Sequence, residues 1–246
     1  STGFVVARYG TDDAGPLTFL TLRTALASGV LGILALATRA PRPDRPQVGW
    51  MSVAALGIHV LYLGGVFVAI DLGMPSGVSA LIAGLHPVVT SFAGAAFLGE
   101  RLRRIQWTGV ALGLLGVVVV VVDRTRAGID GLTGAALFAA GLAVVGMSAG
   151  SIVQRRHGGG GSLLWATTVQ YAAATAVFAV GAVVVEGWDV RWTARTGFAL
   201  AWAVLVLSIG AILLMLLLLR RQSASSVSSL FFLTPALSTV EGAILF

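Results

Sequence analysis

The stretch TGFALAWAVLVLSIGAILLMLLLL, residues 196–219, decides the fold class of this chain. It carries no charged side chain between Arg195 and Arg220. A helix of ~20 apolar residues crosses the ~30 Å hydrocarbon core of a bilayer, so this stretch is long enough to span a membrane. Its continuously apolar end, Leu213 to Leu219, favours a helix, because a membrane β-strand would alternate in hydrophobicity.

Similar stretches recur along the chain. Hydrophobic residues make up 57% of the 246 residues, charged residues make up 11%, and the mean hydropathy is +0.94. A soluble protein needs more charge than this on its surface, so the composition excludes a soluble enzyme, a disordered chain and a nucleic-acid module. The predicted spans are residues 16–38, 48–70, 75–98, 105–122, 131–154, 162–185, 196–219 and 223–246. An apolar segment from Phe4 to Ala7 is interpreted as the end of a first helix, which gives nine helices, the first truncated and a tenth missing.

The basic residues, all of them arginine, predict the orientation of the loops. The intervening loops hold four arginines beside several acidic residues, whereas ten arginines fall in alternate loops, namely Arg39, Arg42, Arg45, Arg101, Arg103, Arg104, Arg155, Arg156, Arg220 and Arg221. The positive-inside rule places these ten in the cytoplasm. We therefore expect a multi-pass protein of the plasma (cytoplasmic) membrane. The chain has no cysteine, which excludes disulfides and zinc thiolates.

Two segments of the sequence are similar to each other. SGVSALIAGLHP at residues 76–87 and SVSSLFFLTP at residues 226–235 both end in proline after a run of small and apolar residues. Five predicted helices separate the copies, and an odd number reverses the second copy in the membrane, as in the inverted repeats of many transporters. The chain then divides into a first repeat, residues 1–126, and a second, residues 127–246. The match is short, so chance similarity is the alternative interpretation.

Several motifs occur in a consistent order: FVVARYG at 4–10, PLTFLTLR at 16–23, SALIAGLHP at 79–87, FLGERL at 97–102, GVALGLLG at 109–116 and VSSLFFLTP at 227–235. In these motifs the sequence resembles the EamA-type family of the drug/metabolite transporter superfamily. The resemblance implies ten helices in two inverted five-helix halves with both termini cytoplasmic. It also implies a central cavity lined mainly by helices 1, 3, 4, 6, 8 and 9, and export of amino acids and other small metabolites or drugs.

Polar side chains inside the predicted spans are the candidates for substrate binding, because such groups are costly in lipid and face the bundle interior or a cavity. The residues predicted to bind substrate are His59, Tyr62, His86, Thr234, Ser238 and Glu241, and those predicted to kink or hinge their helices are Pro87 and Pro235. Hydrogen bonding between helices is the structural alternative for each polar group.

Arg23 is the eighth residue of the span that begins at Pro16. Its side chain either snorkels toward the interface or pairs with Asp12 or Asp13, or it captures the carboxylate of a substrate. Glu241 is the one acid that the predicted spans place well inside the membrane, which makes it a candidate proton or cation site.

The sequence therefore predicts a carrier and not an enzyme: an exporter of small metabolites that works by alternating access between two inverted repeats. A non-transporting membrane scaffold or receptor of the same fold is one alternative. An intramembrane hydrolase is another, because Met147-Ser-Ala-Gly-Ser151 is superficially similar to a serine-protease turn. The expected partners are a small-molecule substrate and the lipid bilayer, with a homodimer left open; no cofactor, metal or nucleic acid is expected.

Overall fold

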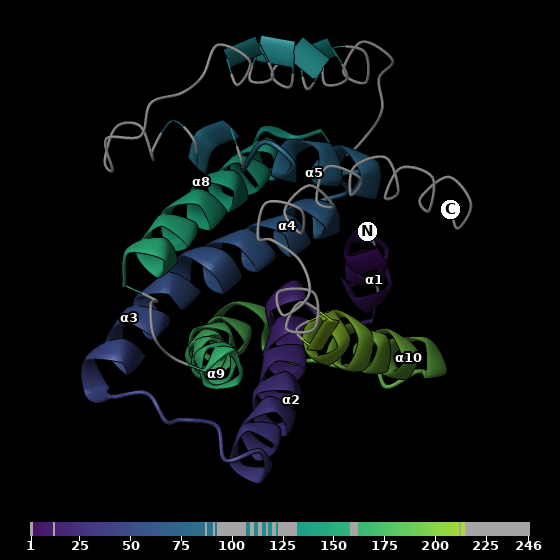
Figure 1. The fold of residues 1–246 in the computed structure, drawn as a ribbon. Coiled ribbons are helices and arrows are strands. Elements are labelled where there is room, and N and C mark those ends of the chain that lie inside the picture. The colour runs from purple at the N-terminus through teal and green to yellow at the C-terminus, as the bar shows by residue number, and fades with distance from the viewer. Residues whose placement is uncertain are drawn as a thin grey trace.

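The computed structural model describes residues 2–11, 13–86, 88–90, 132–157, 162–211 and 213–214, with positions 92, 107–108, 111–112, 115–116, 118–119 and 122. Over these residues the fold is all-helical, with seven continuous helices (Figure 1). They are α1 (Thr2–Thr11), α2 (Pro16–Ala37), α3 (Arg45–Ala55) continuing through a π-helical segment (Leu56–Leu61) into α4 (Tyr62–Asp71), α5 (Ser76–Ala83), α8 (Gly134–His157), α9 (Leu163–Gly181) with a π-helical end (Ala182–Glu186), and α10 (Ala194–Trp202) with a π-helical end (Ala203–Gly210).

Four of these helices are long and apolar enough to cross a membrane: Pro16–Ala37, Arg45–Asp71, Gly134–His157 and Leu163–Glu186. They agree with four predicted spans to within three residues. We call the continuous helix Arg45–Asp71, which comprises α3, the π-helical segment and α4, the third helix. It begins before its predicted start because Asp44 and Gln47 form a reciprocal capping box at its first turn. The predicted span 223–246 lies outside the described residues, and 105–122 is described only at isolated positions.

The outward faces of these helices are apolar. Ile33 on α2 is 69% exposed, Phe138 on α8 is 73% exposed and Val184 beyond α9 is 77% exposed. Such faces would be costly in water, but a lipid bilayer solvates them without loss. The exposed side chains thus support a membrane-embedded bundle.

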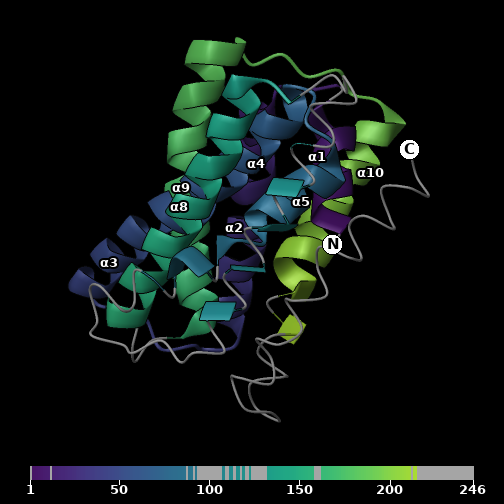
Figure 2. The same cartoon turned by 90° about the horizontal axis from the view of Figure 1, so that it is seen from above.

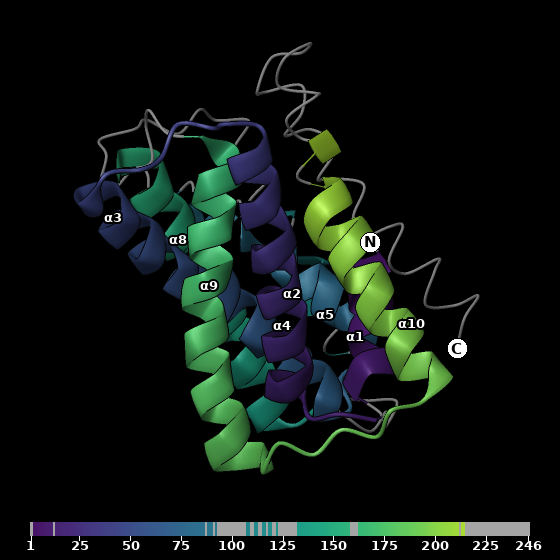
Figure 3. The ribbon, with the colours of Figure 1, turned by 90° about the horizontal axis from the view of Figure 1, so that it is seen from below.

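The helices α2 and α9 pack side by side in opposite directions (Figure 3). Ser28 donates to the Thr168 carbonyl at 3.0 Å, and Thr175 donates to the Thr24 hydroxyl at 2.8 Å. Seen from above, α2 and α4 lie between α3, α8 and α9 on one side and α1, α5 and α10 on the other (Figure 2). The face that α2 buries is therefore near the middle of the bundle.

Close glycine contacts join the third helix to α8. A Cβ on Gly57 would lie 2.5 Å from the Gly146 carbonyl oxygen and 2.6 Å from the Gly150 nitrogen, so the two backbones touch. Gly146 and Gly150 are four residues apart and share one face of α8, the arrangement that lets membrane helices approach closely. Residues 147–151 are thus regular helix, and the turn that a serine-protease motif would need is not formed there.

The loops collect at two ends of the bundle. At one end Trp165 donates to the Ala40 carbonyl at 3.1 Å, and the rings of Trp50 and His157 stack at 3.7 Å. We call this the arginine-rich end, because its described residues include Arg39, Arg42, Arg45, Arg155 and Arg156. At the opposite end the residues before α2 meet the loop before α10, through a β-bridge between Ala14 and Val190.

Candidate functional site

Five polar or aromatic side chains are buried together between α2, the third helix, α9 and the end of α10. They form the central polar cluster, which consists of Arg23, His59, Gln170, Tyr171 and Ser208. Each is at most 9% exposed, although all five carry groups that need hydrogen-bond partners. A polar interior in a helical membrane bundle marks a functional region by default.

Arg23 is the charged member of this cluster and is 6% exposed. Its Nε donates to the Ser208 hydroxyl at 3.2 Å, and its guanidinium interacts with the hydroxyls of Tyr171 and Tyr62. These partners are all neutral. The structure thus places Arg23 in the interior and away from Asp13, whose carboxylate is bonded elsewhere.

His59 lies beside Arg23 at mid-depth of the third helix. Its Nε2 is 3.2 Å from the Gln170 side-chain oxygen, and its ring centroid is 4.7 Å from that of Tyr171. The Gln170 amide nitrogen donates in turn to Gln154 at 3.3 Å. Because the Gln170 oxygen accepts, the proton of this contact is on His59 Nε2.

Local π-helical turns place two members of the cluster. His59 lies in the π-helical segment Leu56–Leu61, and Ser208 lies in Ala203–Gly210. A π-helical turn inserts an extra residue, re-aims the side chains that follow, and is frequent at functional sites. Two π-helical turns contribute side chains beside the same arginine, which indicates a functional site.

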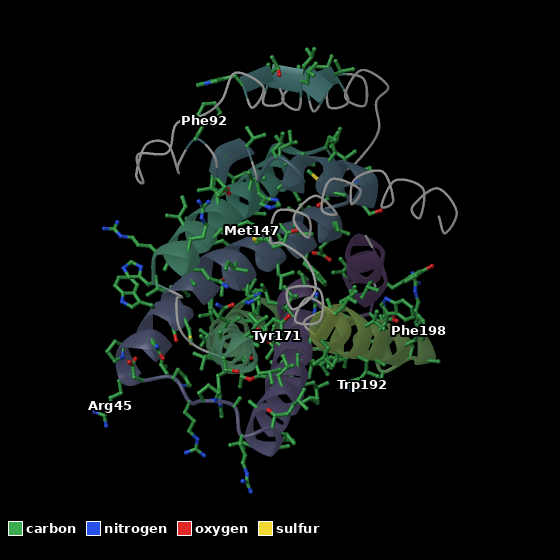
Figure 4. All side chains as sticks on the ribbon, viewed as in Figure 1. Arg45, Phe92, Met147, Tyr171, Trp192 and Phe198 are labelled. Carbon is green, nitrogen blue, oxygen red and sulfur yellow. The ribbon has the colours of Figure 1, made fainter. Side chains whose placement is uncertain are left out.

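Tyr62 joins His59 at this site, as its position three residues later predicts. Its hydroxyl interacts with Arg23, and its ring packs on the apolar core beside the cluster. Figure 4 labels Tyr171 amid the helices, whereas Arg45 projects away from the end of α3. Two of the predicted substrate-binding residues are therefore brought together.

His86 lies elsewhere, where α5 meets α8. Its Nδ1 is 3.0 Å from the Ala83 carbonyl oxygen, and its own carbonyl accepts from Ser148 at 3.1 Å. Pro87 has no N–H, so the carbonyl four residues before it loses its helical donor, and the His86 ring supplies one instead. This hydrogen bond fits the structural alternative for His86 and leaves Nε2 as an acceptor.

The remaining predicted site residues, Pro87, Thr234, Pro235, Ser238 and Glu241, lie outside the described residues. The place of these five stays a prediction.

A small cavity opens toward the arginine-rich end. It has a volume of about 80 Å³ and is lined by Trp50, Met51, Ala54, Val153, Gln154, Leu163, Ala166 and Gln170. Gln170 belongs to both the cavity wall and the central polar cluster. The cavity therefore reaches the side chain that hydrogen-bonds to His59, and it has room for water but not for a metabolite.

At the other end a carboxylate caps α2. Glu186 accepts hydrogen bonds from the Leu17 N–H at 2.7 Å and from both the N–H and the hydroxyl of Thr18, at 2.8 and 2.7 Å. Gly15, the residue before α2, provides no side-chain cap of its own. Glu186 thus satisfies the free donors of α2 and neutralises the positive end of its dipole.

A second contact at this end is the linker clamp, which consists of Asp13, Arg191, Thr193 and Thr196. The Asp13 carboxylate accepts from the hydroxyls of Thr193 and Thr196 at 2.7 and 2.8 Å and lies 3.3 Å from the Arg191 guanidinium. The Arg191 N–H also donates to the Asp13 carbonyl at 2.9 Å. The clamp ties the residues before α2 to those before α10.

We expect the linker clamp to weaken in acid. The Thr193 hydrogen bond, followed by that of Thr196, holds the pKa of Asp13 below its ordinary value, and the Arg191 charge acts in the same direction. A carboxyl group whose pKa is lowered by folding stabilises the fold above its unfolded pKa of ~3.9, and this stability is lost as the pH falls through the folded value.

The temperature of the unfolding midpoint should therefore decrease as the pH is lowered from about 5 to about 3, and this decrease should be smaller in Asp13→Asn. Asp189→Asn, in the loop before α10 that also contains Arg191, is the control and should keep the wild-type pH dependence. Equal pH dependence in Asp13→Asn and the wild type would contradict the role of the clamp.

The structure adds residues that sequence reasoning missed. Gln170 and Tyr171 were not among the candidates, although a lone amide inside the span 162–185 is a usable signal. The cluster also draws on α2 and α9, the second and seventh helices, which the resemblance does not count among the main cavity walls. The capping role of Glu186 depends on a contact across 168 residues and has no local sequence signal.

Comparison with known proteins identifies a transporter family and several relatives. Residues 1–122 match the EamA-like transporter family. The uncharacterized inner membrane transporter YedA of Escherichia coli is 32% identical over 124 residues, which are 49% of this chain and 39% of that protein. A probable amino-acid metabolite efflux pump of the same organism is 31% identical over 122 residues, 49% of this chain and 38% of that protein.

More distant similarity extends to an exporter and to a solved structure. A probable terminal-alkyne amino-acid exporter of Streptantibioticus cattleyicolor is 28% identical over 125 residues, 50% of this chain and 41% of that protein. The chain thus spans about two fifths of the length of the curated relatives it matches. A crystal structure with 23% identity covers 99% of this chain and 96% of its own, with a TM-score of 0.57, which shows a shared fold.

Proposed function

The chain belongs to the EamA-like transporter family of membrane transporters, and from this premise we propose that it is a carrier that exports small metabolites, namely amino acids or amphipathic drug-like solutes. The family is typically non-enzymatic. Two of the relatives are named as a probable amino-acid metabolite efflux pump and a probable terminal-alkyne amino-acid exporter, which supports this direction and substrate class.

In this proposal, transport proceeds by alternating access between two inverted repeats, residues 1–126 and 127–246. The match of the family to residues 1–122 supports the first boundary. The bundle also brings side chains of both repeats together, because Arg23 belongs to the first and Ser208 to the second. A site between two repeats is accessible to each side of the membrane in turn when the repeats rock against each other.

The observation that carries the proposal is the central polar cluster. A buried arginine, an imidazole and an amide within one bundle are costly unless they serve a ligand or a fixed network. His59 and Tyr62 are the proposed substrate-binding residues here, joined by His86, Thr234, Ser238 and Glu241, with Pro87 and Pro235 as kinks. A homodimer is compatible with this site but not required by it.

The arginine-rich end is proposed to face the cytoplasm of an inner membrane. This orientation follows the positive-inside rule. With it, the cavity beside Gln170 opens inward, and the linker clamp and Glu186 close the outer end. In this arrangement the bundle is closed at the outer end and holds a water-sized cavity at the inner end, where an exporter would admit its substrate after a further opening.

Export from cells that express the chain tests this function. Cells preloaded with a panel of labelled amino acids and drugs should lose at least one of them faster than cells with an empty vector. His59→Ala and His86→Ala should lower the export rate about tenfold while leaving the amount of protein in the membrane unchanged, because each removes a hydrogen-bonding group from the proposed path.

His157→Ala is the matched control, since its ring stacks on Trp50 at the arginine-rich end and lies outside the cluster. It should export at the wild-type rate. Wild-type rates in both His59→Ala and His86→Ala would contradict the assigned site. Absence of flux for every solute would favour a membrane scaffold or receptor of the same fold.

A further inference from the structure

Arg23 is a buried, positively charged residue, and no residue that the structure describes supplies a negative charge to balance it. The side chain is 6% exposed; it donates to the Ser208 hydroxyl, and the side chains of Tyr171 and Tyr62 are its other polar neighbours. Hydroxyls can accept its hydrogen bonds but carry no negative charge. An isolated ion in a low-dielectric interior is unfavourable by several kcal/mol until an opposite charge joins it.

The nearby acids are already engaged. Asp13 is bonded to Thr193, Thr196 and Arg191, and Glu186 caps α2 at its first turn. Among the described residues, no carboxylate lies within ion-pair distance of Arg23. The Arg23 guanidinium is therefore a desolvated and fixed positive charge. Its remaining N–H donors can bind an anion that enters from solution.

The surroundings of Arg23 restrict that anion. Phe19 and Ala27 lie one turn before and one turn after it on the same buried face of α2, and the rings of Phe19 and Phe67 stack at 5.8 Å. One guanidinium balances one negative charge, whereas a phosphate ester with nearly two charges needs a second cation. The site thus suits a monoanion attached to an apolar tail.

We propose that Arg23 and Ser208 form a subsite that binds the carboxylate of a small solute with an apolar tail. The inference rests on the proposed carrier function and names the chemical group that its site selects. The planar guanidinium binds the carboxylate in bidentate fashion, while the Ser208 hydroxyl holds Nε and so fixes the plane of the fork. The tail lies against the aromatic face beside Phe19.

Two probes that differ only in charge test the subsite. Isocaproate and isocaproamide share one branched aliphatic tail, and their binding to the purified full chain is measured from the shift of its thermal midpoint. Wild type should bind isocaproate about ten- to a hundredfold more tightly, the expected strength of a charged hydrogen-bond pair. In Arg23→Gln this preference should shrink to less than about twofold.

Three further variants make the result specific. Arg23→Lys keeps the charge but loses the planar fork, so it should retain a weaker preference. Ser208→Ala leaves the guanidinium in place and should also retain part of it. Arg42→Gln removes an exposed arginine at the arginine-rich end and should bind both probes as wild type does.

Equal binding of the two probes to wild type overturns the subsite, and so does an undiminished preference in Arg23→Gln. Equal binding is also the result expected if a side chain such as Glu241 balances Arg23. The export assay separates this inference from the carrier function. Export without a carboxylate preference contradicts the subsite alone, whereas a carboxylate preference without export of any solute contradicts the carrier function alone.

Discussion

Replacing Gly57 by alanine should lower the free energy of unfolding by about 3 kcal/mol, at the upper end of what overpacking costs. The new Cβ would meet the Gly146 carbonyl oxygen at 2.5 Å and the Gly150 nitrogen at 2.6 Å. Both are backbone atoms, so no rotamer change can relieve the clash. The third helix and α8 must move apart, and the π-helical segment that presents His59 moves with them.

The measurement is the thermal midpoint of the purified protein, which should fall by about 6–12 °C. Gly141→Ala is the matched control. It lies on α8 as well, but a Cβ there meets nothing within 4 Å. Alanine is also the better helix former, so this variant should be neutral or slightly stabilised. Equal midpoints for Gly57→Ala and wild type would show that the two helices can accommodate a methyl group at this contact, and would contradict the prediction.

The long apolar helices could be predicted from the sequence because the physics that produces them is local. A bilayer requires ~20 uncharged residues per helix, and charged residues mark where each helix leaves it. Pro16–Ala37, Gly134–His157 and Leu163–Glu186 all follow this pattern. The pairing of His59 with Tyr62 on one face was equally local, since it follows from helical spacing.

The rest of the site could not be predicted because it depends on contacts between distant segments. The π-helical turns at Leu56–Leu61 and Ala203–Gly210 have no sequence pattern that we could identify, yet they aim His59 and Ser208. The interior position of Arg23 depends on Ser208, which is 185 residues away. From the sequence alone, snorkelling, pairing with an acid and substrate capture all stayed open for Arg23. The packing of α10 and its π-helical end against α2 buries the side chain in the bundle interior.

The second large effect is expected at Glu186. In Glu186→Ala the two N–H groups of Leu17 and Thr18 lose their acceptor, and the start of α2 loses the charge that balances its dipole. Loss of a helix cap costs 0.5–2 kcal/mol and loss of a dipole partner adds to it, so we expect about 2 kcal/mol and a fall of about 4–8 °C in the thermal midpoint. Glu186→Gln keeps one acceptor oxygen and should lie between alanine and wild type.

Asp189→Ala provides the control, because this exposed acid lies in the same loop and should unfold as wild type does. Glu186 also holds together helices of the two proposed repeats, so its loss should favour opening at that end. The chain has no cysteine, and Ala14, 5% exposed beside the linker clamp, can report this opening as Ala14→Cys. A membrane-impermeant maleimide added outside cells should label it faster when Glu186→Ala is present. A lower thermal midpoint with an unchanged labelling rate would mean that Glu186 stabilises α2 without controlling access, and an unchanged midpoint would contradict the cap itself.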